Sequence, residues 1–194
     1  MNSYSSLKKE FSEYWREKPV RTMFWVRFLA YFLIYLSPFW GMVLAIYLDS
    51  WDWDYLQKYN VSKTWYHRID KVVDFLEYLV IIPLVLTTPI APYYLVFLIW
   101  RTVGMVLYFV YEKKPVVFVI FPNMAEYLAL LYFASEQFNF GWEVTSISWL
   151  VGLLVFKLII ELQFHYFQLF LPIKQSKQPK LLQWYARFNQ SLIK

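Results

Sequence analysis

Long apolar stretches, separated by short polar or proline-containing segments, dominate this chain. At 1.5 Å per residue, a helix needs about 20 apolar residues to cross a hydrocarbon core of about 30 Å. Five stretches are long enough, over residues 23–48, 70–88, 93–111, 116–135 and 147–171. The pattern therefore predicts an all-α fold: a polytopic bundle of about five transmembrane helices, forming a single integral membrane domain over residues 1–194.

Two prolines are expected to bend these helices. Pro38 follows Ser37 near the middle of the first stretch, and Pro122 lies within the fourth. Proline interrupts the helical hydrogen-bond ladder and commonly kinks it.

Residues 49–69 are expected to form a polar loop, whose tryptophans and tyrosines suit the headgroup region. The short connection 87–92, with two prolines, predicts a tight turn between antiparallel helices.

Both ends of the chain predict helices that lie at the membrane surface. Residues 1–22 place aromatic and leucine side chains at helical spacing, with charged residues on the remaining face. Residues 173–194 repeat this pattern with a strongly basic polar face. Such amphipathic helices bind in the interface plane, so we expect membrane lipids to be partners of both tails.

Composition narrows the class of protein. Hydrophobic residues make up 59% of the chain and charged residues 17%, which is too apolar for a soluble domain of this size or for a disordered chain. The chain has no cysteine, which excludes thiolate catalysis and iron–sulfur clusters. Only four glycines are present, so aromatic side chains are expected to supply much of the packing between helices.

Lys and Arg residues favour the cytoplasmic side of a membrane. With five crossings, the side that holds residues 49–71, 112–115 and the C-terminal tail carries eleven of them, and the opposite side carries the five of the N-terminal tail. The count predicts a protein of the plasma or inner membrane with its N-terminus outside and its C-terminus in the cytoplasm. A sixth span, or one that fails to cross, would instead place both basic tails on one side.

Ionisable residues inside the predicted spans are the candidates for function, because a charge in hydrocarbon is costly and usually faces the protein interior. One helical face of the second span and one of the fifth carry such residues: His67, Asp70, Asp74 and Glu77, and Lys157, Glu161, His165 and Gln168. The third and fourth spans add Arg101, Asn123 and Glu126. The residues expected to bind a ligand or ion are Asp74, Glu77, Arg101, Asn123, Glu126, Lys157 and Glu161.

Most of these groups are expected at one level, about 10–16 Å below the cytoplasmic surface, with Lys157 about 21 Å deep. The four carboxylates of the set would then face only its two bases. A buried surplus of acid takes up protons or holds a cation. The expected function is binding or transport of protons, of a cation or of a cationic, lipid-like small molecule. One five-helix protomer is small for a carrier, so a homo-oligomer is expected.

Two other functions remain open. Pairs such as Arg101 with Glu126, and Lys157 with Glu161, are also typical of ion pairs that hold helices together, which predicts a structural or accessory subunit of a larger membrane complex. A weaker pattern favours a lipid-modifying enzyme with a divalent metal, or less readily a haem, near the cytoplasmic surface. The expected metal ligands are His67, Asp70, Glu161 and His165.

A third acidic group lies just after the first span. Asp49, Asp52 and Asp54 resemble the aspartate-rich magnesium-binding motifs of membrane prenyltransferases and CDP-alcohol phosphotransferases, but the further aspartates of those motifs are absent. A solvated acidic loop is therefore expected here. No base-reading motif accompanies the basic tails, so nucleic acid is not an expected partner.

Overall fold

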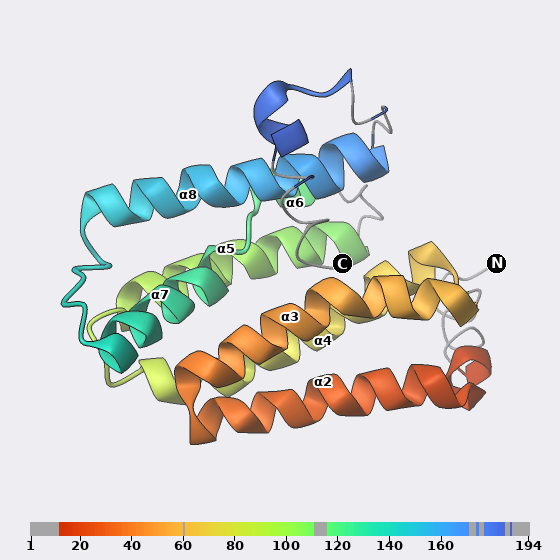
Figure 1. Ribbon diagram of the computed structural model, residues 1–194, viewed down its shortest axis with the longest axis horizontal. Helices are drawn as coiled ribbons and strands as arrows, with labels where there is room; N and C mark the ends of the chain where they lie inside the picture. Colours follow the sequence, from red (N-terminus) through yellow and green to blue (C-terminus); the bar gives the residue numbers. More distant parts are fainter. Residues whose placement is uncertain are drawn as a thin grey trace. The chain divides into compact units, whose positions relative to one another are not determined.

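The computed structural model describes residues 12–59, 61–110, 116–170, 174, 177–184 and 187, without the side chains of residues 53, 54, 57, 63, 64 and 168–170. Every regular element in this part of the chain is helical (Figure 1). The chain divides into two compact units, Met1–Leu84 and Val85–Lys194. The predicted all-α fold is confirmed, and each unit is described separately below.

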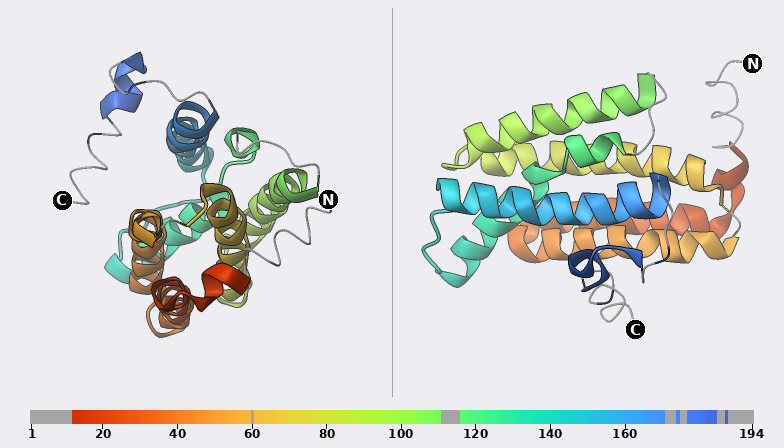
Figure 2. Two further views of the ribbon diagram at one scale, coloured as in Figure 1. Left: turned by 90° about the vertical axis from the view of Figure 1, so that its right-hand side faces the viewer. Right: turned by 90° about the horizontal axis from the view of Figure 1, so that it is seen from above.

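Unit 1 contains three long helices, α2 (Lys18–Leu36), α3 (Pro38–Leu56) and α4 (Lys63–Val85), with a 3₁₀ turn at Gln57–Tyr59. Helices α2 and α3 form an antiparallel hairpin, and α4 lies alongside it (Figures 1 and 2). The prediction of one kinked span over residues 23–48 is therefore wrong. Two helices share those residues, and the polar loop expected over residues 49–69 is largely helical as well.

The chain reverses at Ser37 for a local reason. A residue before proline is disfavoured in the α conformation, and Ser37 is extended, with φ −151° and ψ 95°. Pro38 then begins α3, because proline lacks an amide hydrogen and suits the first position of a helix. Hydrogen bonds from Ser37 N to Leu33 O (2.9 Å) and from Gly41 N to Ser37 O (2.7 Å) close the turn.

Gly41 allows the two helices of the hairpin to touch. A Cβ atom at this position would lie 2.5 Å from the Cα and the backbone nitrogen of Ile34. Those atoms belong to the backbone of α2, so no side-chain rotation can relieve the contact. The glycine therefore fixes the close approach of α2 and α3 next to their turn.

We expect Gly41→Ala to destabilise the protein by about 1–3 kcal/mol, since the added methyl group forces the helices apart. The measurement is the unfolding free energy in detergent. Gly152→Ala is the matched control, because nothing lies within 4 Å of a Cβ at Gly152. That change is expected to stabilise the helix that contains Gly152, α8 (Ile147–Glu161), by about 0.5–1 kcal/mol through the helical preference of alanine. Equal effects of the two substitutions would contradict the tight contact at Gly41.

An apolar cluster closes the open end of the hairpin, where the chain enters α2 and leaves α3. Val20 and Trp65 are fully buried there, and Met23, Leu56, Val61 and Tyr66 complete the cluster. The rings of Tyr14 and Phe24 pack against Trp65 at centroid distances of 4.7 and 6.3 Å. This cluster anchors the start of α4 against the hairpin.

Unit 2 contains α5 (Ala91–Val110), the short α6 (Val117–Ile120), α7 (Met124–Phe138) and α8 (Ile147–Glu161). A π-helix over Leu162–Phe170 extends α8. Residues 121–123, around Pro122, are not helical, so the predicted kink is a complete break between α6 and α7. Asn123 starts α7, where its side chain accepts a hydrogen bond from the Glu126 amide.

Three helices in the described part of the chain are long and apolar enough to cross a membrane: Lys18–Leu36, Ala91–Val110 and Ile147–Phe167. This is fewer than the five predicted. Helix α4, which covers the predicted second span, carries too many charged residues along its first four turns. The predicted fourth span is interrupted at residues 121–123.

The two predicted interfacial tails fall mostly outside the described residues. Within 1–22, residues 12–16 are helical and α2 begins at Lys18. Within 173–194, residues 180–184 are helical.

Candidate functional site

Arg27 lies at the centre of the larger group of buried charges in unit 1. Its guanidinium reaches four carboxylates: Asp49 on α3 at 2.7 Å, Asp70 on α4 at 2.9 Å, Asp74 on α4 at 3.2 Å, and Asp52 on α3. Arg27 itself is only 2% exposed. We call this set, together with Lys71 and Tyr66, the Arg27 cluster.

Helical spacing explains how these groups converge. Asp49 and Asp52 are three residues apart on α3, and Asp70 and Asp74 are four apart on α4, so each pair lies on one helical face. Helix α2 contributes the cation at the centre. All three helices of unit 1 are therefore held together at this level by charge-assisted hydrogen bonds.

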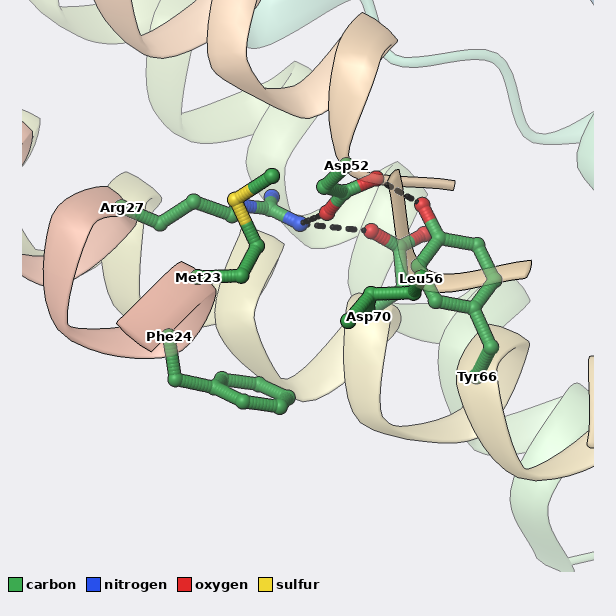
Figure 3. Close-up of a pocket in the computed structure, with 7 residues that line it drawn as sticks. All are labelled: Met23, Phe24, Arg27, Asp52, Leu56, Tyr66 and Asp70. Atoms are coloured by element: carbon green, nitrogen blue, oxygen red, sulfur yellow. Dashed lines mark hydrogen bonds and ion pairs between the residues drawn. The ribbon is translucent and has the colours of Figure 1, made fainter. Parts of the chain in front are cut away.

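Lys71 and Tyr66 complete the cluster. The Lys71 ammonium lies 2.8 Å from Asp70 Oδ2 and 2.7 Å from Asp74 Oδ2. The Tyr66 hydroxyl donates to Asp52, opposite the guanidinium (Figure 3). Among the described residues, the Arg27 cluster thus comprises four carboxylates and two cations, a surplus of two acids in a largely buried site.

A small cavity of about 10 Å³ opens beside Arg27 (Figure 3). It has room for about one water molecule. Its lining residues are Met23, Phe24, Arg27, Asp52, Leu56, Tyr66 and Asp70. An organic ligand does not fit this cavity, whereas a proton or a water molecule does.

The two carboxylates of α3 differ in environment. Burial raises the pKa of Asp52 from 3.8 to about 7, although Arg27 and Tyr66 act in the opposite direction. Asp52 is 2% exposed, whereas the side chain of Asp49 is 42% exposed. Asp49 is therefore the member of the cluster with a partly exposed side chain.

Oxygens of Asp49, Asp70 and Asp74 lie within 4.8 Å of one another, a spacing that a metal ion would accept. The Arg27 guanidinium already bonds to all three carboxylates, and Lys71 bonds to two of them. A metal ion would have to displace these cations, so the arrangement favours the protein's own bases in this position.

Unit 2 gathers a second group of buried charges around Glu161, near the end of α8. Its carboxylate lies 2.9 Å from His165 Nε2, 3.7 Å from Lys157 Nζ and 3.8 Å from Arg101 Nη1. The backbone nitrogen of Asn123, at the helix break, donates to it at 3.4 Å. We call these residues, together with Glu126, the Glu161 cluster.

The bases of the Glu161 cluster are also supported by other groups. Arg101 donates to the carbonyl of Phe121 at 2.8 Å and lies 4.3 Å from the centre of the Phe118 ring. Lys157 lies 4.1 Å from the centre of the Tyr127 ring. The carbonyl left free by the break at Pro122 is therefore capped by α5, and both bases gain cation–π contacts.

The structure divides the predicted ligand-binding residues between the two units. Five of them lie together in the Glu161 cluster: Arg101, Asn123, Glu126, Lys157 and Glu161. Asp74 belongs to the Arg27 cluster, and Glu77 is buried one turn further along α4. Apart from His165, which carries a charge only when protonated, the Glu161 cluster holds two cations, Arg101 and Lys157, against two glutamates.

The predicted metal ligands are divided in the same way. His67 and Asp70 are in unit 1, while Glu161 and His165 are in unit 2. Both oxygens of Asp70 already face Arg27 and Lys71. His165 lies on Glu161, and the ring of His67 packs against Tyr66 with centroids 5.4 Å apart.

Sequence reasoning missed Arg27, Lys71 and the role of Asp49 and Asp52. One signal was present, because Arg27 is the only Asp, Glu, Lys, Arg or His residue between positions 22 and 48. An isolated arginine in such a stretch indicates buried acidic partners. The first two acids that follow Arg27 in the sequence, Asp49 and Asp52, are among those partners.

No protein-family model, no curated protein and no solved structure matches this chain.

Proposed function

We propose that this chain is an integral membrane protein that transports protons and takes them up at the Arg27 cluster. Three helices supply the apolar length that membrane insertion requires. Large apolar side chains are also exposed along each of them, among them Leu36 on α2, Ile99 on α5 and Ile147 on α8. Acyl chains are the natural cover for such side chains.

The observation that carries the proposal is the surplus of acid around Arg27. Four carboxylates share two cations in a site where Arg27, Asp52, Asp70 and Lys71 are all less than 9% exposed. Protonation of one carboxyl lowers the electrostatic cost of such a site. Asp52, with a pKa of about 7, is the group that changes its protonation near neutral pH.

The shape of the site favours a proton over the other ligands considered. The cavity beside Asp52 holds about one water molecule, which excludes a lipid-like ligand. A small cation would compete with Arg27 for the same oxygens. Asp49 is exposed and bonds to the same guanidinium, so it is the group through which a proton enters.

Asp52→Asn tests the proposal, since it keeps the shape of the side chain and removes its titration. Wild-type protein in liposomes should speed the collapse of a pH gradient, and Asp52→Asn should reduce the rate to that of protein-free liposomes.

Asp52→Asn should also flatten the pH dependence of the unfolding free energy. Because the pKa of Asp52 is higher in the folded state, its contribution to stability grows as the pH falls from about 8 to about 4.

The matched control is Glu143→Gln, which removes an exposed carboxylate and should leave the flux unchanged. Asp52→Asn should fold, since it lowers the surplus of acid rather than breaking a balanced pair. If wild-type liposomes lose their gradient no faster than empty ones, the protein does not transport protons.

A second function is favoured by the Glu161 cluster. Its Arg101 and Lys157 balance its two glutamates, and its bonds join α5, the helix break and α8. Such a site suits a structural role, as in an accessory subunit of a membrane complex. Flux that persists in Asp52→Asn, or that is absent from the wild type, would favour this alternative.

A further inference from the structure

The hairpin of α2 and α3 has two halves of different chemistry, with Arg27 at the boundary. Between positions 28 and 48, which include the turn, neither leg carries an Asp, Glu, Lys, Arg or His residue. On the other side of Arg27 lie the acids of α3 and, at the open end, the exposed bases Arg16, Lys18 and Lys58. The apolar half reaches about 14 Å beyond Arg27, half of a hydrocarbon core.

The two halves also differ in how their apolar side chains are covered. At the open end, Val20, Leu56 and Trp65 are at most 1% exposed, because they pack in the cluster at the start of α4. In the apolar half, Leu36 is 82% exposed, Leu29 60% and Phe32 55%. Side chains of the protein itself therefore cover the apolar residues of the open end. The exposed side chains of the apolar half need a cover from outside the protein.

Tryptophan marks the boundary between the two halves. Trp25 and Trp51, one on each leg, are 55% and 40% exposed at the level of the Arg27 cluster. Exposed tryptophans are enriched where hydrocarbon meets headgroups. The exposed charges at the open end, which are the acids Glu13 and Glu17 as well as these bases, lie further out, where headgroups and water solvate them.

A complete crossing by α2 conflicts with this arrangement. Arg27 is the middle residue of α2, so it would lie at the centre of the bilayer. Its partner Asp49, with a side chain 42% exposed, would then lie at the same depth. An exposed carboxylate at that depth is among the costliest placements for a side chain.

We infer that the α2–α3 hairpin enters one leaflet and returns to the same side, with acyl chains covering residues 28–48 and the Arg27 cluster at headgroup level. The turn suits a position near the bilayer midplane, because hydrogen bonds within the hairpin occupy the Ser37 amide and carbonyl, and Pro38 has no amide hydrogen. The inference rests on the membrane location proposed above, but not on proton transport.

The chain has no cysteine, so single-cysteine variants can be labelled without background. In sealed vesicles, a membrane-impermeant maleimide should label Lys18→Cys and Lys58→Cys from one and the same side. Ser37→Cys, at the turn, should react from neither side and become reactive only after detergent dissolves the membrane. Tyr35→Cys provides a second position near the turn, and Glu143→Cys, in an exposed connection, provides a positive control.

Labelling of Ser37→Cys from the side opposite to Lys18→Cys would show two complete crossings and overturn the inference. Labelling of both from the same side would place the hairpin outside the bilayer and overturn it equally. A separate measurement, flotation of the wild type with liposomes after alkaline washing, tests the membrane location itself. If the wild type does not float with the liposomes, the proposed function is rejected as well. If the labelling is as expected but no proton flux is observed, proton transport alone is rejected.

Discussion

Arg27→Leu is expected to cost about 3–5 kcal/mol of unfolding free energy at neutral pH. The substitution fills the space with an apolar side chain and leaves Asp52, Asp70 and Asp74 buried with only Lys71 to balance them. The loss should shrink as the pH falls. Without Arg27, Asp52 and Asp70 lose a cation that holds their pKa values down, and protonated carboxyls need no counter-cation, so low pH restores stability to the variant.

Denaturant unfolding in detergent, repeated at several pH values, measures this effect. Arg27→Lys keeps the charge, but one ammonium cannot bond to four carboxylates at once, so an intermediate loss of stability is expected. Arg16→Leu, an exposed position near the open end of the hairpin, should change stability by less than about 0.5 kcal/mol. If Arg27→Lys and Arg16→Leu match the wild type in stability, the cluster does not hold unit 1 together.

Glu161→Gln is expected to destabilise the protein by about 3 kcal/mol, since it leaves Arg101 and Lys157 buried with one carboxylate fewer. The glutamine retains the shape of the side chain and one carbonyl acceptor for the Asn123 amide. The loss therefore measures the missing charge. Thermal unfolding, followed by near-ultraviolet circular dichroism of the many aromatic side chains, gives the readout.

Glu136→Gln, an exposed position near the end of α7, is the matched control and should have little effect. Replacement of Lys157 by methionine in the Glu161→Gln background should recover part of the stability, because it removes one of the two stranded cations. Additive losses in that double variant would show that Lys157 and Glu161 act independently.

Hydrophobic pattern predicted the helical class, the boundaries of α5 within two residues and the site of the helix break at Pro122. It failed at Pro38, where the same kind of signal marks a reversal of the chain. Apolar content alone cannot separate a kinked span from a hairpin. The close contact of Gly41 with Ile34 decides between them, and that contact depends on tertiary packing.

For the candidate residues too, local spacing was predicted correctly, whereas their tertiary partners were not. Helical spacing placed Asp70 and Asp74 on one face, and Glu161 and Lys157 on another. Depth was counted along five assumed spans, and the residues that it grouped belong to both units, Asp74 and Glu77 to unit 1 and the others to unit 2. The sequence did not reveal the role of Arg27, because α2 was expected to be half of a longer span. Arg27 is the base that balances the acids of α3 and α4.

The position of Arg27 has a consequence for how the polypeptide is assembled during synthesis. Its first acidic partner on α3, Asp49, lies 22 residues downstream, whereas Asp74 of α4 lies 47 residues downstream. The nascent hairpin therefore brings its own counter-ions as it leaves the ribosome. Helix α4, which adds two more acids and Lys71, is synthesised after both helices of the hairpin.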